Sequence, residues 1–322
     1  MTGRRRKNEQ PGVLALAEEA VLLVRRAPLA AWACYLAATV PFVLGVLYFW
    51  SDMSRGAQAH DRCASAALGL AALFVVMKIG QSFFVAHLID ALSQRPRPWT
   101  GRRFLRLAAV QGAIQPWGLF VMPLALLLMY PFVIVHGYYH HWTAIGDGED
   151  MNLKRLRRRA WTLARQDMRS QTFTLWLLSP WLLGLGMLAT FGAVRMVALI
   201  VPAAEIQGAA WFAIGALLFA VFAGLLSPLG FALTLNIGIL FVTIPELLRM
   251  FLGWDTLFRI SAGYALANTT FLAALFGVAY LCMDPVVKAA YAIRTFRTES
   301  LRNGRDILVA IRDLRDAREA AS

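Results

Sequence analysis

The chain has 322 residues, of which 59% are hydrophobic and 16% are charged, and its formal net charge is +13. A mean hydropathy of +0.57 excludes an ordinary soluble globular protein, so the composition predicts a membrane protein. A positive charge of this size also occurs in nucleic-acid-binding proteins, and the placement of the basic residues along the chain distinguishes the two classes.

The basic residues fall into four blocks. Positions 1–26, 95–106, 154–169 and 288–322 hold 26 of the 32 Lys and Arg residues. Because cytoplasmic loops of membrane proteins carry an excess of Lys and Arg, all four blocks and both termini are expected on the cytoplasmic side. Each block adjoins an apolar run and lacks interleaved base-stacking aromatics, which favours anionic lipid over nucleic acid as the partner.

Taken in chain order, the apolar runs predict an all-α bundle of transmembrane helices. Residues 13–26 form an amphipathic stripe, so 1–27 is predicted to be a cytoplasmic region with an interfacial helix. One crossing needs about 20 apolar residues. Single crossings are predicted within 29–50, 62–90, 173–194 and 260–283, and Pro-broken hairpins within the uncharged stretches 107–146 and 206–245.

This assignment gives eight crossings between residues 28 and 283, or six if either hairpin re-enters without spanning. A basic cytoplasmic helix at 151–171 interrupts the bundle, and a break at Ser227 and Pro228 divides the second hairpin. Asp284 and Pro285 form an N-cap and first-turn pair that predicts a new helix there. A second amphipathic helix is expected after Gly304, so 284–322 is predicted to form cytoplasmic amphipathic helices.

Lys78 lies in an otherwise apolar run. It is 16 residues after Arg62 and 12 before Asp90, which places it about 24 Å and about 18 Å from these charges along a helix, near the centre of the bilayer. A lysine there costs about 2.5–3.5 kcal/mol. Two interpretations stay open, a site that coordinates a solute or proton and a structural hydrogen-bonding post. Gln81 and Ser82 follow at three and four residues, so all three side chains are expected on one helical face that points into the bundle. The candidate intramembrane polar site comprises Lys78, Gln81, Ser82, Asn236 and Asn268.

The basic helix supplies a second candidate surface. Its side chains are expected to contact anionic lipid or a protein partner, and they are Lys154, Arg155, Arg157, Arg158 and Arg159. His136 and His140 have a spacing that can bind zinc, but no catalytic glutamate lies between them, which favours histidines at the membrane boundary. No phosphate-binding glycine loop or nucleophile elbow is present. The sequence therefore predicts no catalytic, cofactor or metal residues.

Four segments, at Phe49–Ser54, Phe241–Phe258, Ala267–Phe271 and Asp284–Ile307, resemble a family of uncharacterised bacterial multi-pass membrane proteins. More loosely, the Pro-broken hairpin followed by a basic helix is similar to the membrane domain of some glycerophosphodiester phosphodiesterases. The catalytic domain of those enzymes has no counterpart in these segments, so their activity does not carry over. The resemblance implies a bacterial inner-membrane location.

Two functions are compatible with these observations. The first is a non-enzymatic inner-membrane subunit or scaffold that docks a membrane-complex partner through its basic helices and its C-terminal apolar stripe, at Ile307, Leu308, Ile311 and Leu314. The alternative is a transporter of a small anionic solute or lipid headgroup that uses the intramembrane lysine.

Overall fold

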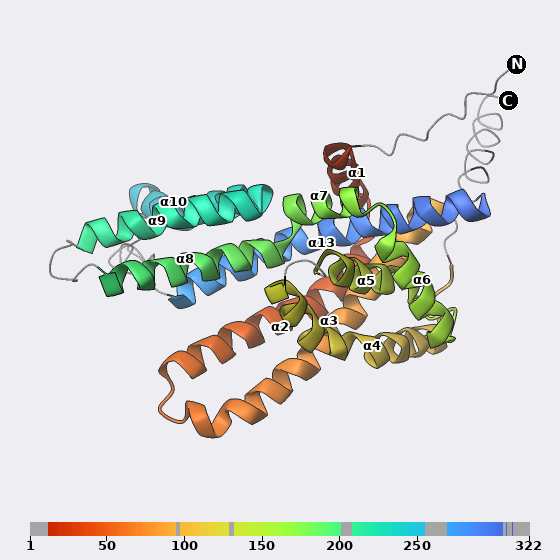
Figure 1. The fold of residues 1–322 in the computed structure, drawn as a ribbon, viewed down its shortest axis with the longest axis horizontal. Coiled ribbons are helices and arrows are strands. Elements are labelled where there is room, and N and C mark those ends of the chain that lie inside the picture. Colours follow the sequence, from red (N-terminus) through yellow and green to blue (C-terminus); the bar gives the residue numbers. More distant parts are fainter. Residues whose placement is uncertain are drawn as a thin grey trace, which may run out of the picture. The chain divides into compact units, whose positions relative to one another are not determined.

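The computed structural model describes residues 12–94, 97–128, 132–200, 208–254, 269–304, 307 and 311. In this part of the chain every regular element is an α-helix, which confirms the all-α prediction (Figure 1). The helices are α1 (Val13–Arg25), α2 (Leu29–Arg55), α3 (Ala59–Ser93), α4 (Gly101–Leu128), α5 (Phe132–Ile145), α6 (Leu153–Arg165), α7 (Met168–Leu178), α8 (Pro180–Ile200), α9 (Gly208–Leu226), α10 (Pro228–Leu252) and α13 (Thr269–Asn303).

Five of the described helices are long and apolar enough to cross a membrane, namely α2, α3, α4, α10 and α13. The pair α7 and α8, bent by 58° at Ser179, makes a sixth if it is one broken span. The described residues thus give five or six candidate crossings, and the choice between six and eight for the whole chain stays a prediction. In the first predicted hairpin, α5 has 14 residues and is about 21 Å long, too short to cross. The reason is that α4 continues to Leu128 and so takes up more than half of the uncharged stretch 107–146.

The helix start predicted at Asp284 is wrong, because α13 runs without a break from Thr269 to Asn303 with Pro285 inside it. Proline lacks the N–H that would bond the carbonyl four residues earlier, but the helix tolerates this loss. The boundary predicted at Gly304 is confirmed, since α13 ends at Asn303, and most of the second amphipathic helix predicted after it lies outside the described residues. Gly304 has a φ of +62°, the left-handed conformation that glycine adopts most readily, and its N–H donates to the carbonyl of Ser300 at 2.7 Å.

The chain forms two compact units. The first unit comprises Met1–Leu36, Lys78–Thr174 and Val286–Ser322, and the second comprises Ala37–Met77 and Leu175–Pro285. All four basic blocks fall within the first unit. The basic residues are therefore gathered in one unit, although they are dispersed along the sequence.

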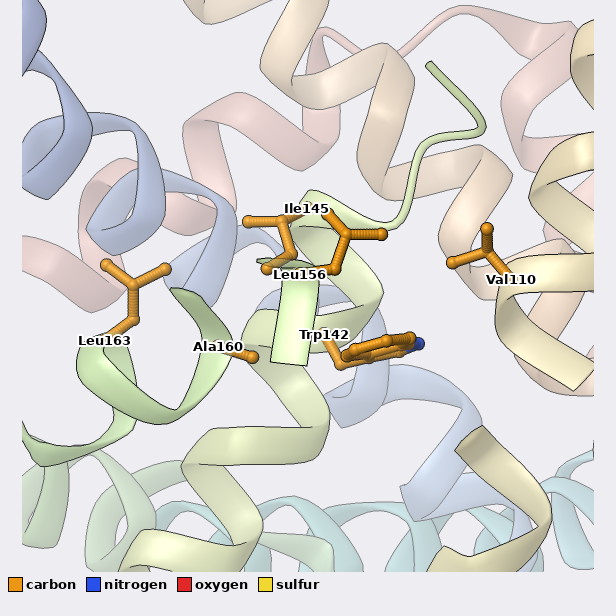
Figure 2. Packing of buried hydrophobic residues seen from close by; sticks show 6 residues of the cluster. All are labelled: Val110, Trp142, Ile145, Leu156, Ala160 and Leu163. Atoms are coloured by element: carbon orange, nitrogen blue, oxygen red, sulfur yellow. The ribbon is translucent and has the colours of Figure 1, made fainter. Parts of the chain in front are cut away.

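In the first unit, α5 is buried along most of its length and packs against α4 and α6. The buried positions of α6 recur at intervals of three and four residues, so they lie on one face of the helix. Trp142 is the largest side chain of the cluster between these helices. Figure 2 shows its six buried members, Val110, Trp142, Ile145, Leu156, Ala160 and Leu163.

The second unit is held by small residues that let helices approach closely. Gly186 on α8 lies so near Ala223 on α9 that a Cβ at this position would come within 2.8 Å of the Ala223 Cα. Leu183 and Ala279 complete its buried cluster. The break predicted at Ser227 is confirmed, because α9 ends at Leu226 and α10 begins at Pro228.

Candidate functional site

Lys78 lies on α3 with 9% of its surface exposed. Its Nζ donates to Oε1 of Gln81 at 3.1 Å, within the same helix. Ser82 is fully buried, and its Oγ donates to the Thr143 carbonyl of α5 at 2.9 Å. The three side chains predicted to share one face of α3 are therefore all buried, and Ser82 fastens that face to α5. α3 has 35 residues and is about 22 Å longer than the bilayer core, so different parts of the helix can lie in the bilayer. The distances from Lys78 to Arg62 and Asp90 therefore do not fix its depth.

Two glutamines of α4 extend this polar seam. Gln111 Nε2 donates to Ser82 Oγ and to the Gly146 carbonyl, both at 2.9 Å. Gln115 Nε2 donates to Gln111 Oε1 at 3.0 Å and to Thr143 Oγ1 at 3.1 Å. The last carbonyls of a helix have no partner inside it, so the bond from Gln111 to Gly146 satisfies one at the C-terminal end of α5, and Gln115 orients Gln111. Sequence reasoning missed both glutamines, although their spacing of four residues within an uncharged run was a signal.

The two predicted asparagines have different outcomes. Asn236 is exposed on α10 in the second unit, and its Nδ2 donates to the Ala232 carbonyl of its own helix at 2.7 Å. Its amide is therefore satisfied locally. Asn268 lies outside the described residues.

The three histidines of α5 are buried against α13 within the first unit. His136 Nδ1 is hydrogen-bonded to the hydroxyl of Tyr291 at 3.2 Å, and the Lys288 ammonium donates to His140 Nδ1 at 3.3 Å. His141 Nδ1 lies 2.8 Å from Oγ1 of Thr295. Positions 288, 291 and 295 lie on one face of α13, so these contacts form a continuous polar seam between two helices.

The sequence did not indicate that these histidines contact another helix, because it predicted a new helix start at Asp284, whereas α13 continues and brings its second half alongside α5. Their position at the membrane boundary stays a prediction. Within the described ranges, no three His, Cys, Asp or Glu side chains are arranged to hold a metal ion. The histidines act there as hydrogen-bonding groups in a packed seam.

The basic face of α6 consists of Lys154, Arg155, Arg157, Arg158 and Arg159, and all are exposed except Arg159, which is half-buried. Arg155 pairs with Asp150 at 2.6 Å, and Arg159 pairs with Glu299 of α13. Burial alone would raise the pKa of Asp150, but its hydrogen bonds with the Asn152 N–H and the Arg155 side chain lower that pKa. Lys154 and Arg158 form no ion pair with any described residue.

A surface hollow of about 370 Å³ lies on this face. Its lining residues are Asn152, Lys154, Arg155, Arg158, Arg159 and Thr162. Arg157 belongs to the same helix but does not line the hollow. We call this feature the basic hollow.

Arg97 forms an ion-pair junction that the sequence did not indicate. Its guanidinium contacts Asp90 at 2.6 Å, Asp147 at 2.7 Å and Glu149 at 2.8 Å. Burial alone would lower the pKa of Arg97, but the three carboxylates together raise it above its ordinary value. Asp147 and Glu149 therefore tie the loop after α5 to the end of α3.

The described polar interior is thus a set of helix-joining seams, while the basic hollow is open at the surface and carries net positive charge. The chemistry available there is the binding of an anion by several guanidinium and ammonium groups. The resemblance to a family of bacterial membrane proteins stays a prediction. In comparisons with known proteins, no family model matches the chain, and neither curated proteins nor solved structures give a match.

Proposed function

We propose that this chain is a non-enzymatic, multi-pass protein of the bacterial inner membrane that serves as a subunit or scaffold of a membrane complex. Its N- and C-termini are cytoplasmic in this proposal. The absence of catalytic motifs from the sequence supports the non-enzymatic role. The five candidate membrane helices support the location in a membrane.

Ion pairs within the first unit support a common side for the basic blocks. Arg297 of α13 pairs with Glu19 of α1, and Glu299 of α13 pairs with Arg159 of α6. Side chains can pair in this way only if their helix ends lie on the same side of the membrane. The excess of Lys and Arg on that side then supports its assignment to the cytoplasm.

The observation that carries the scaffold proposal is the exposure of apolar side chains just after these ion pairs. Leu301, Ile307 and Ile311 are 63%, 62% and 57% exposed, respectively. Ile307 and Ile311 are four residues apart, so both lie on one helical face. The ion pairs fix the end of α13 shortly before these residues in the sequence, and exposed apolar side chains on one helical face are suited to contact with a protein partner.

The packing around Lys78 favours the scaffold over the transporter of a small anionic solute or lipid headgroup. Its ammonium is bonded within its own helix, beside the buried Gln81 and Ser82. An ion or solute path through this point needs a hydrated opening next to the lysine. A structural role requires only the packed seam.

Photo-crosslinking in living cells tests the scaffold proposal. A photoreactive residue at position 307 or 311 should give a discrete protein adduct. The same residue at Leu188, which is equally exposed on the apolar helix α8, should give no such adduct. If positions 307 and 311 give the same pattern as position 188, the apolar face docks no protein partner and the proposal is wrong.

A further inference from the structure

We propose that the basic hollow of α6 binds the headgroup of a phospholipid that carries at least two negative charges on phosphate. This inference rests on the proposed cytoplasmic position of α6 and names the lipid chemistry that the helix recognises. The binding groups are Lys154 and Arg158, with Arg155 and Arg159 at their sides.

The charges in the hollow define the ligand. Four basic side chains line it, and two of them share their charge with the carboxylates of Asp150 and Glu299. Lys154 and Arg158, one helical turn apart, form no ion pair with a described residue, so no carboxylate there neutralises their charges. The excess of two positive charges matches a dianionic phosphate group better than a single phosphodiester.

The geometry of α6 makes the hollow a fixed surface. The opposite face of the helix is buried in the first unit through Leu156, Ala160 and Leu163. Asn152 caps the helix by accepting the Arg155 N–H at 3.0 Å, and the two ion pairs orient Arg155 and Arg159. Because these side chains are already ordered, binding loses less conformational entropy than binding to a disordered basic segment.

The surroundings of the hollow favour a membrane surface over an acidic protein. Met151, Leu153 and Trp161 are exposed near the hollow on α6 or just before it. The guanidinium of Arg165 lies 4.6 Å from the Trp161 ring. Aromatic and apolar side chains beside basic ones are typical of the boundary between lipid headgroups and acyl chains.

The full-length protein, purified in mild detergent, should be titrated with short-chain phosphatidic acid, phosphatidylglycerol and phosphatidylcholine. We expect phosphatidic acid to bind at least about tenfold more tightly than phosphatidylglycerol, and phosphatidylcholine not to bind. The double substitution Lys154→Gln and Arg158→Gln should weaken phosphatidic acid binding by about thirty-fold. Neither residue forms an ion pair in the described structure, so this variant should keep the fold.

The matched control is the double substitution Arg157→Gln and Arg169→Gln, which removes the same charge from exposed positions outside the hollow. It should weaken binding by no more than about threefold. Equal losses in the two double variants, or equal affinity for phosphatidylglycerol and phosphatidic acid, would overturn the inference. Competition by inorganic phosphate at the concentration of the lipid would assign the hollow to free phosphate instead, and tighter binding of an acidic peptide would assign it to a protein.

Crosslinking at position 307 does not depend on lipid binding. The scaffold proposal and the lipid-binding proposal can therefore each fail without the other.

Discussion

Replacing Trp142 with alanine should lower the free energy of unfolding by about 3–5 kcal/mol, the largest effect expected of any substitution considered for this chain. Trp142 is fully buried, where α5 packs against α4 and α6. Its indole N–H has no hydrogen-bond partner among the described residues, so the loss is one of packing alone. Denaturant unfolding of the purified protein, followed by circular dichroism in mild detergent, measures this change.

The control for this substitution is Trp161→Ala on α6. Trp161 is 42% exposed, and its stacking with Arg165 lies at the surface. Its removal should cost less than about 1 kcal/mol. If the two tryptophan variants lost the same stability, the packing of α5 between α4 and α6 would not be the core of the first unit.

The second large effect is expected at the ion-pair junction. Arg97→Met should lower the free energy of unfolding by about 2–3 kcal/mol, because it leaves Asp90 and Asp147 without their common cation. These carboxylate side chains are only 9% and 15% exposed. The cost stays below the roughly 3–5 kcal/mol of a fully buried pair because the Arg97 side chain is 27% exposed. Thermal and denaturant unfolding of the purified protein both measure this loss of stability.

A matched substitution is available in the same basic block. Arg102 is exposed and forms no ion pair with a described residue, so Arg102→Met should change the stability by no more than about 0.5 kcal/mol. The free energy of unfolding of Arg97→Lys should lie between those of the Arg97→Met and Arg102→Met proteins, because lysine keeps the charge but not the guanidinium that contacts three carboxylates. Equal stability of the Arg97→Met and Arg102→Met proteins would show that the junction is not a structural anchor.

Features that depend on local chemistry were predictable from the sequence. The break at Ser227 follows from a serine and proline in an apolar run, and the helix end at Gly304 follows from the left-handed conformation that glycine allows. The burial of Ser82 followed from its spacing relative to Lys78 on one helix. In each case the determining residues lie within one or two helical turns of one another.

Features that depend on distant partners were not predictable. Pro285 is usually a poor residue inside a helix, but packing of the second half of α13 against α5 outweighs the lost hydrogen bond. That packing also buries the histidines of α5. Likewise, nothing near Asp147 in the sequence indicates that Arg97, fifty residues away, is its partner. Hydropathy identifies which segments avoid water, but it does not identify the partners they pack against.

The central claim is that the basic blocks of the first unit face the cytoplasm. Its most direct test is labelling of Arg157→Cys with a membrane-impermeant maleimide, in a protein whose native cysteines have been replaced. Ala57→Cys, in the connection between α2 and α3, should react in intact cells, and position 157 should react only after the inner membrane is permeabilised. Reaction of position 157 in intact cells would contradict the account.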